Sequence, residues 1–404
     1  MRTGSGLLGA AVASTILVLL LVIVPAPADP DLPGRFDGAR TVAATLRGDG
    51  PRADFAADYV GARALLNGRD PYPLLADAFK NVGLDWPVYA RSTHPPTAEV
   101  LALPVARFSW ATASAIWAWL MLIALVVSGW ALGLRLTWAA AVAMLAVLLW
   151  PPAAWSVCQL TALWLLGAAV AWRWREQSLF AGLAIGLAAL TKLFPALLLA
   201  PFLLHRRWNT ATGLAAVFGS AMSIALILNP HSLSRFLEVG SREADQQRFR
   251  LDNGSLPMGA FNHAGQLALA AALLLLLTVA TSAILEARRE PHVSFDNYCK
   301  WLWLTVALLP VAWVYSLLAL TPILMSGLRS RRPLAMLSAG TAIILPAITL
   351  PFRADSAPYV ALSIALAGLA LLRSPAQLLT RIGELSSRSE RALRLSDHDG
   401  AGSL

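Results

Sequence analysis

Two acidic residues, Asp54 and Asp58, open a polar segment that reads DFAADYVGARALLNGRDPY and follows a long apolar run. On a helix, a spacing of four residues places both carboxylates on the same face. Beside a membrane of low dielectric constant a carboxylate holds its proton more readily, which suits a general base acting on a hydroxyl group. The alternative is that both acids solvate a surface helix, with Arg63 and Arg69 as their ion-pair partners.

Two cationic candidates lie further along the chain. His94 precedes Pro95 and Pro96, which fix an extended lead into the next apolar segment. An imidazole there can bind a phosphate or pyrophosphate, or it can cap a helix. Lys192 interrupts a long apolar run and is followed by Pro195. An ionisable residue at membrane depth is a functional hypothesis, here a ligand for an anionic lipid phosphate, and the alternative is an ammonium that snorkels to the interface.

Further polar candidates lie between apolar segments. Gln159 follows the string WPPAAW, where it can serve a site or form a hydrogen bond between helices. The stretch from Arg235 to Asn262 carries charges of both signs, which is typical of a solvated surface, although one arginine among them can bind phosphate. Its charged residues include Arg242, Arg248, Arg250, Glu238, Glu243, Asp245 and Asp252.

The composition predicts an all-α polytopic membrane protein. Of the 404 residues 57% are hydrophobic and 14% are charged, with a mean hydropathy of +0.61. Residues 6–26 form an apolar run longer than the core of a signal peptide, so we expect a retained first helix. Cys158 and Cys299 are the two cysteines, too few for a disulfide framework or a thiolate metal site, and we expect both to pack as small apolar side chains.

The distribution of charge orients the chain. The formal net charge is +9, and short basic clusters recur in the turns between apolar segments, which marks these turns as cytoplasmic. The charges are spread rather than gathered on one face, so no nucleic-acid partner is expected. We predict one integral membrane domain over residues 1–373, with outer loops at 28–96 and 229–261, and a basic cytoplasmic tail at 374–404.

The apolar segments predict about 11 to 13 membrane helices or half-helices and a helical first outer loop. They lie at about residues 6–26, 97–107, 110–134, 137–151, 158–174, 177–191, 193–204, 209–228, 262–286, 299–309, 312–326, 332–351 and 357–373. The segment 97–107 is short, contains Pro104 and Arg107, and is expected to enter the membrane only part of the way, which keeps the later basic loops on one side. No Walker A loop, GxGxxG fingerprint, HExxH motif or nucleophile elbow is present. A nucleotide-activated substrate is therefore not expected, and a lipid-borne donor remains.

Several strings together resemble glycosyltransferase family 87, over about residues 50 to 325. The opening segment resembles the first outer-loop motif of that family, closed here by Gly68, Asp70, Pro71 and Tyr72. HPPTAEVLALPVARF resembles its aromatic-Pro-Pro motif, with His94 in place of a tyrosine, and CQLTALWLL resembles its Gly-Gln motif. The strings AGLAIGLAALTKLFPALLLAPFLLHRRW and NGSL are similar to two further motifs.

The resemblance implies a fold of the GT-C type and a polyprenyl-phosphate sugar as donor. By this resemblance Asp54 is the catalytic base and Lys192 a ligand of the donor phosphate. We expect His94, Arg248 and Arg250 to assist in binding the donor phosphate. The residues expected to contact the acceptor or to support the site are Asp58, Tyr59, Tyr72, Gln159, Asn253, Ser255 and Tyr315.

One string departs from the family. Members often carry Pro-x-Ser-Trp-Asp-His on a late outer turn, whereas residues 310–315 of this chain read PVAWVY. The acid and the histidine are absent. Their role is either lost here or moved to Tyr315, His231 or His263.

We therefore expect an inverting transferase in the plasma (inner) membrane, crossing it several times, with its site facing the periplasm or outside. It would move a mannose-like or arabinofuranose-like residue from a polyprenyl monophosphate to a lipid-linked or polysaccharide acceptor, without a cofactor or metal. The alternatives are a transporter or flippase of polyprenyl-linked glycans, and an inactive homologue that acts as an assembly partner. A transporter usually shows paired repeats with polar sites at the midplane, whereas this chain has no repeat and concentrates its polarity on one side.

Overall fold

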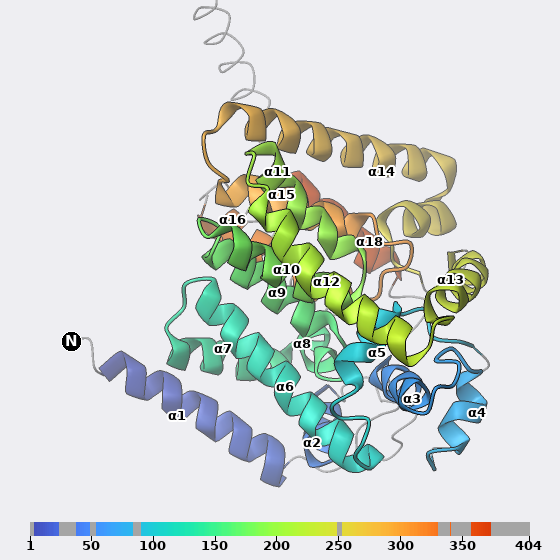
Figure 1. Ribbon diagram of the computed structural model, residues 1–404. Helices are drawn as coiled ribbons and strands as arrows, with labels where there is room; N and C mark the ends of the chain where they lie inside the picture. The colour runs from blue at the N-terminus through green and yellow to red at the C-terminus, as the bar shows by residue number, and fades with distance from the viewer. Residues whose placement is uncertain are drawn as a thin grey trace, which may run out of the picture.

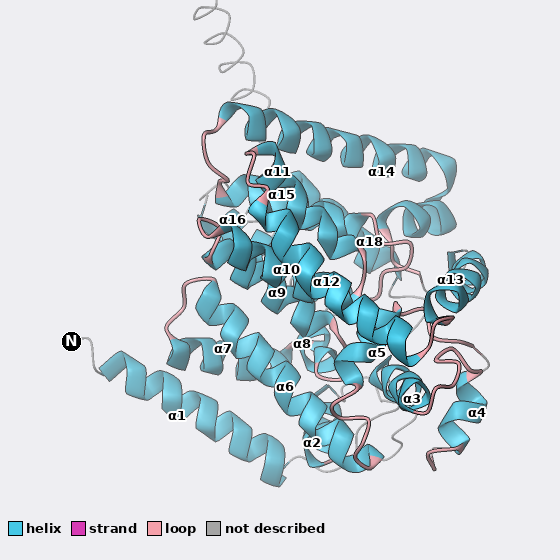
Figure 2. Cartoon of the chain, viewed as in Figure 1, coloured by secondary structure: helices cyan, strands magenta, loops and turns pink. Residues whose placement is uncertain are grey.

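A computed structural model describes residues 4–23, 38–48, 54–83, 90–248, 253–329, 340 and 357–372. These residues form helices and connecting turns, and none of them lies in a strand (Figure 2). The all-α polytopic membrane architecture expected from the sequence is confirmed. The tail at 374–404 and parts of both predicted outer loops lie outside the described residues.

Within the part of the chain that the structure describes, three helices are long and apolar enough to cross a bilayer: α6 (Trp110–Ala131), α12 (Asn209–Leu228) and α14 (Leu256–Arg289). The longest is α14, whose helical path is broken at Gly265 (φ 76°, ψ −162°), a conformation that glycine adopts without a steric cost. Large apolar side chains on its outer surface, such as Leu267 with 87% exposure, are those that lipid would cover.

Shorter apolar helices pack around these three. The first, α1 (Gly4–Val18), lies against α7 (Leu136–Leu149), and α9 (Thr161–Arg173) packs between α6 and α10 (Ser178–Thr191) (Figure 1). Small residues permit these close approaches. A Cβ atom added at Gly182 of α10 would lie 2.1 Å from the carbonyl oxygen of Thr210 in α12, so only glycine allows the two backbones to touch there.

Two apolar segments of the sequence are interrupted rather than continuous. The segment at 193–204 divides into a 3-10 helix, η2 (Phe194–Leu199), and α11 (Ala200–Leu204). The segment at 312–326 divides into η3 (Val314–Leu320) and α16 (Thr321–Arg329). Pro195 and Pro201 explain the first division, since proline donates no backbone hydrogen bond.

The second half of the bundle contains α15 (Phe295–Ala307) and α18 (Ala357–Leu371), which both pack against α14. The indole Nε1 of Trp303 donates to the carbonyl of Ile364 at 2.7 Å and joins these two helices. In the first half, the stacked rings of Phe55 and Trp117, with centroids 4.4 Å apart, lie in a separate apolar core.

The two predicted polar regions meet at one end of the bundle. From the first come α2 (Gly38–Arg47), α3 (Asp54–Leu66) and α4 (Leu75–Lys80), followed by α5 (Pro96–Ala102). From the second comes α13 (Ser232–Arg248), which contacts α5 and the end of α12 (Figure 1). The helical first loop is thus observed, and α5 is the short helix expected at 97–107.

Candidate active site

The structure brings four of the predicted residues together in the lining of one narrow pocket. Asp54 enters from the start of α3, and His94 from the segment before α5. Gln159 follows α8 (Pro151–Ser156), and Lys192 follows α10. The pocket is completed by Leu160, Thr161, Trp164 and Thr191.

Lys192 reaches the pocket because α10 ends at Thr191. The backbone of Lys192 is extended (φ −155°, ψ 148°), and Pro195 lies in the 3-10 helix that follows. Its side chain is half-buried, and Nζ lies 5.8 Å from the ring centroid of Tyr315, within the range of a cation–π contact. Among the described residues the ammonium has no hydrogen bond or ion pair, so it is available to an anion.

Asp54 is fixed through its backbone and its carboxylate. The next residue, Phe55, donates its backbone N–H to the carbonyl of Cys158 at 3.1 Å, which ties the first turn of α3 to the chain before α9. The hydroxyl of Tyr315, in η3, donates to Oδ2 of Asp54 at 3.0 Å. Of the three residues proposed to replace the missing acid and histidine, Tyr315 is the one at the pocket, since His231 and His263 have exposed side chains elsewhere.

Asp58 and His94 form a buried pair beside the pocket. His94 Nδ1 lies 2.6 Å from Oδ1 of Asp58, whose side chain is fully buried, and Oδ2 has no partner among the described residues. Burial raises the pKa of Asp58. Burial alone would lower the pKa of His94, but the negative charge of Asp58 and the hydrogen bond to it raise that pKa above its usual value. The pair therefore keeps a proton to higher pH than free side chains do.

This geometry bears on the alternatives left open by the sequence. The N-cap of α5 is Pro95, and the ring of His94 turns to Asp58 instead of capping that helix. Arg63 donates to the hydroxyl of Tyr59 at 2.8 Å and lies over the ring of that tyrosine, and among the described residues it forms no ion pair with Asp54 or Asp58. Asp58 is not a solvated surface residue.

Glu99 is a buried acid that sequence reasoning missed. It lies on α5 with no exposed surface, and neither carboxyl oxygen has a partner among the described residues. A Cβ atom added at Gly61 would lie 2.7 Å from its carboxyl carbon. Gly61 follows Asp58 by three residues, so Glu99 places a second buried carboxyl one helical turn from Asp58. The rule that selected Lys192, an ionisable group inside an apolar segment, would also have selected Glu99.

Other predicted site residues lie away from the pocket. The hydroxyl of Tyr59 donates to the carbonyl of Phe108 at 2.8 Å, and its ring packs against that of Trp110. The hydroxyl of Tyr72 donates to the carbonyl of His94 at 3.1 Å. These tyrosines hold the polypeptide around the pocket rather than line it.

Asn253 and Ser255 join two distant turns. Nδ2 of Asn253 donates to the carbonyl of Pro310 at 2.9 Å, while Oδ1 accepts from the backbone N–H of Ser255 at 2.9 Å and of Ala312 at 3.2 Å. The NGSL string therefore anchors the second polar region to the turn that precedes Tyr315. The side chain of Arg248, the last residue of α13, and all of Arg250 lie outside the described residues.

The arrangement can support proton transfer and anion binding in one place. Asp54 supplies an acceptor for a proton, and Lys192 supplies a positive charge across the same pocket. Within the described part of the chain, no group of three or more His, Cys, Asp or Glu side chains is placed to hold a metal ion.

Comparison with known proteins gives one match. The family model described as Glycosyltransferase family 87 matches residues 93–345, which is more than half of the chain. The matched range contains His94, Gln159, Lys192 and Tyr315, and it begins after Asp54. Neither a curated protein nor a solved structure matches the chain.

Proposed function

The chain belongs to glycosyltransferase family 87 and is a membrane glycosyltransferase; from this premise we propose that it uses a polyprenyl-monophosphate sugar as donor. The sugar is a mannose-like or arabinofuranose-like residue, and the acceptor is a lipid-linked or polysaccharide glycan. The observation that carries the proposal is that Asp54 and Lys192 line the same pocket, with Tyr315 in contact with both.

The proposed reaction is a single displacement with inversion. Asp54 removes the proton of the acceptor hydroxyl as its oxygen attacks the anomeric carbon. The bond from that carbon to the phosphate oxygen breaks, and the polyprenyl phosphate leaves with the bonding electrons. Lys192 stabilises the negative charge that grows on the leaving phosphate. Tyr315 orients the base, because its hydrogen bond occupies Oδ2 of Asp54 and leaves Oδ1 for the acceptor.

The depth of the pocket supports a lipid-borne donor. Thr161 and Thr191 line the pocket and stand at the start of α9 and the end of α10, helices of 13 and 14 residues. At 1.5 Å per residue these helices are roughly 20 Å long, whereas a bilayer core is ~30 Å thick. If their other ends lie at one membrane surface, the pocket is recessed below the opposite one.

The basic turns gather at those other ends. Arg207 donates to the carbonyl of Arg175 and pairs with Glu176 at 2.7 Å, and Nε2 of His205 lies 3.1 Å from the carbonyl oxygen of Glu290. By the positive-inside rule this end is cytoplasmic, and the pocket then faces outward in the plasma membrane.

The test is transfer of a labelled sugar from a polyprenyl phosphate to crude membrane acceptor by purified protein. We expect wild type and Asp77→Asn, which changes an exposed acid on α4, to transfer equally, and Asp54→Asn to lose transfer by at least about 100-fold. Equal transfer by Asp54→Asn would remove this residue from the mechanism. No transfer by wild type with any acceptor would favour a flippase or an inactive assembly partner, the latter motivated by the absent acid and histidine.

A further inference from the structure

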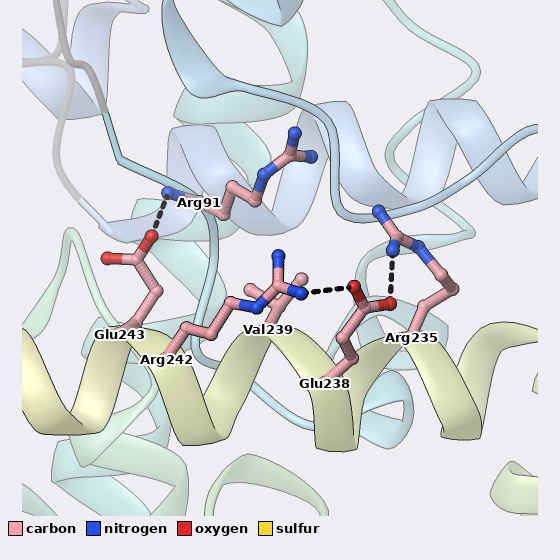
Figure 3. Close-up of a pocket in the computed structure, with 6 residues that line it drawn as sticks. All are labelled: Arg91, Arg235, Glu238, Val239, Arg242 and Glu243. Carbon is pink, nitrogen blue, oxygen red and sulfur yellow. Dashed lines mark hydrogen bonds and ion pairs between the residues drawn. The ribbon is translucent and has the colours of Figure 1, made fainter.

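A second pocket, with a cavity volume of about 120 Å³, lies between α13 and the segment that precedes α5 (Figure 3). It is separate from the pocket that holds Asp54 and Lys192. Its lining consists almost entirely of charged side chains from two regions far apart in the sequence: Arg91, Arg235, Glu238, Val239, Arg242 and Glu243.

The charged groups hold one another in place. Glu238 lies between two guanidinium groups, paired with Arg235 on one side and with Nη2 of Arg242 at 3.1 Å on the other (Figure 3). Glu243 accepts from the backbone N–H of Arg91 at 3.4 Å. Arg235 is further fixed by Asp70, whose Oδ2 accepts from Nε at 3.1 Å and from Nη2 at 3.0 Å. These ion pairs and hydrogen bonds therefore join the charged groups that line the pocket into one network.

The net charge of the residues around the pocket favours an uncharged ligand. Three arginines face two glutamates, and Asp70 provides the third negative charge, so the cluster as a whole is neutral. A neutral cluster gives little attraction to a free anion. It does present both N–H donors and carboxylate acceptors at fixed positions, and a sugar hydroxyl is both a donor and an acceptor. Val239 is the apolar member of the lining and is 4% exposed, so contact with a ligand falls mainly to the polar groups.

The second pocket is close to the first along the chain. Arg91 lines one and His94 lines the other, three residues apart, which is at most ~10 Å of extended chain. Tyr72 braces this segment at both ends, because its carbonyl accepts from the Arg91 guanidinium and its hydroxyl donates to the His94 carbonyl. The separation of the two linings is thus within the length of a glycan of a few sugar units.

We propose that the second pocket is a saccharide subsite, which holds non-reacting sugar units of the acceptor while its terminal hydroxyl reaches Asp54. The proposal rests on the proposed function for the identity of the acceptor as a glycan. In this proposal Arg91, Arg242 and Glu243 bind neutral sugar units rather than a phosphate group.

Binding without turnover tests the subsite. Full-length protein in nanodiscs is titrated with mannotriose and with an arabinofuranosyl trisaccharide by saturation-transfer difference NMR. We expect one of these neutral sugars to bind wild type and Lys80→Ala, an exposed residue of α4, with equal affinity. Arg242→Ala and Glu243→Gln should each weaken binding about tenfold, because each removes one charge-assisted hydrogen bond. Inorganic phosphate should not displace the sugar.

Three results would overturn the subsite: no binding of either sugar, equal binding by both pocket variants, or displacement by inorganic phosphate, which would make it an anion site. Kinetics separate this proposal from the reaction mechanism. Arg242→Ala should raise the KM for the acceptor about tenfold with little change in kcat or in the donor KM. Asp54→Asn should bind the trisaccharide like wild type, so loss of transfer with intact binding, or the reverse, shows which proposal has failed.

Discussion

The hydroxyl group of Tyr315 lies 3.0 Å from Oδ2 of Asp54, although 261 positions separate the two residues in the chain. The ring of the same tyrosine lies 5.8 Å from the Lys192 ammonium. One side chain thus contacts both the proposed base and the proposed phosphate ligand, and its hydroxyl and its ring can be tested separately.

Replacing Tyr315 by Phe removes the hydroxyl and keeps the ring. We expect kcat to fall roughly tenfold, because the carboxylate of Asp54 loses the hydrogen bond that orients it, while the donor KM changes by less than about twofold. Steady-state transfer from a labelled polyprenyl-phosphate sugar measures both. Tyr359→Phe, at a position 40% exposed on α18, is the matched control. A kcat for Tyr315→Phe equal to that of the control would contradict the orienting role.

Replacing Lys192 by Met removes the only charge of this side chain and preserves most of its length. We expect kcat/KM for the donor to fall by about 100-fold or more, because the leaving phosphate loses its counter-charge. Lys192→Arg should retain part of the activity, since it keeps the charge but not the shape. Lys80→Met on α4 controls for loss of a lysine. Unchanged donor kinetics in Lys192→Met would place the phosphate elsewhere.

The buried pair of Asp58 and His94 predicts a pH-dependent contribution to stability. Both groups have a pKa raised in the folded state, Asp58 through burial and His94 through the charge of Asp58 despite burial. The folded protein therefore binds more protons than the unfolded chain, so the contribution is present at low pH and is lost as pH rises through the folded pKa values. The double variant Asp58→Asn/His94→Gln removes both titrations.

We expect the wild type to exceed this double variant in Tm by more at about pH 5 than at about pH 9. Thermal unfolding in detergent at the two pH values measures the difference. An advantage that is constant, or that grows with pH, would show that the two groups do not hold a shared proton in the folded state.

Replacing Gly61 by Ala tests the packing of the buried Glu99. The added Cβ would lie 2.7 Å from the carboxyl carbon of Glu99, so we expect a loss of about 1–3 kcal/mol in the free energy of unfolding. Gly240→Ala on α13, whose nearest neighbouring atom lies at 3.8 Å, should be neutral or stabilising. The double variant Gly61→Ala/Glu99→Ala should recover part of the loss, and a purely additive result would contradict direct contact.

Much of the helical framework could be read from the sequence. Apolar length predicted α6, α12 and α14, and the prolines near 195 and 201 account for a break that hydropathy alone does not show. The strings that resemble family motifs also predicted residues that the fold brings together, since Asp54, His94, Gln159 and Lys192 line one pocket. Their roles in catalysis remain predictions.

Other features depend on partners that no local pattern reveals. Asn253 was expected to contact the acceptor or to support the site, and its amide is bound to groups at Pro310 and Ala312, more than 50 residues away, which no local pattern shows. Tyr59 belongs to the same motif as Asp54, but the opposite side of its helix packs against Phe108 and Trp110. The second pocket depends on the meeting of α13 with the segment near Arg91, a tertiary contact between two regions that each read as ordinary polar loops.

The shortness of α9 and α10 has a kinetic consequence under the proposed reaction. A donor with a polyprenyl tail would arrive by lateral diffusion within the leaflet, so its encounter rate would follow its mole fraction among the lipids instead of its bulk concentration. The acceptor glycan would come from the aqueous side, past α13. Diluting the donor with inert phospholipid at constant total donor should therefore slow transfer, whereas diluting the vesicles with buffer that keeps the acceptor concentration constant should not slow transfer per enzyme molecule.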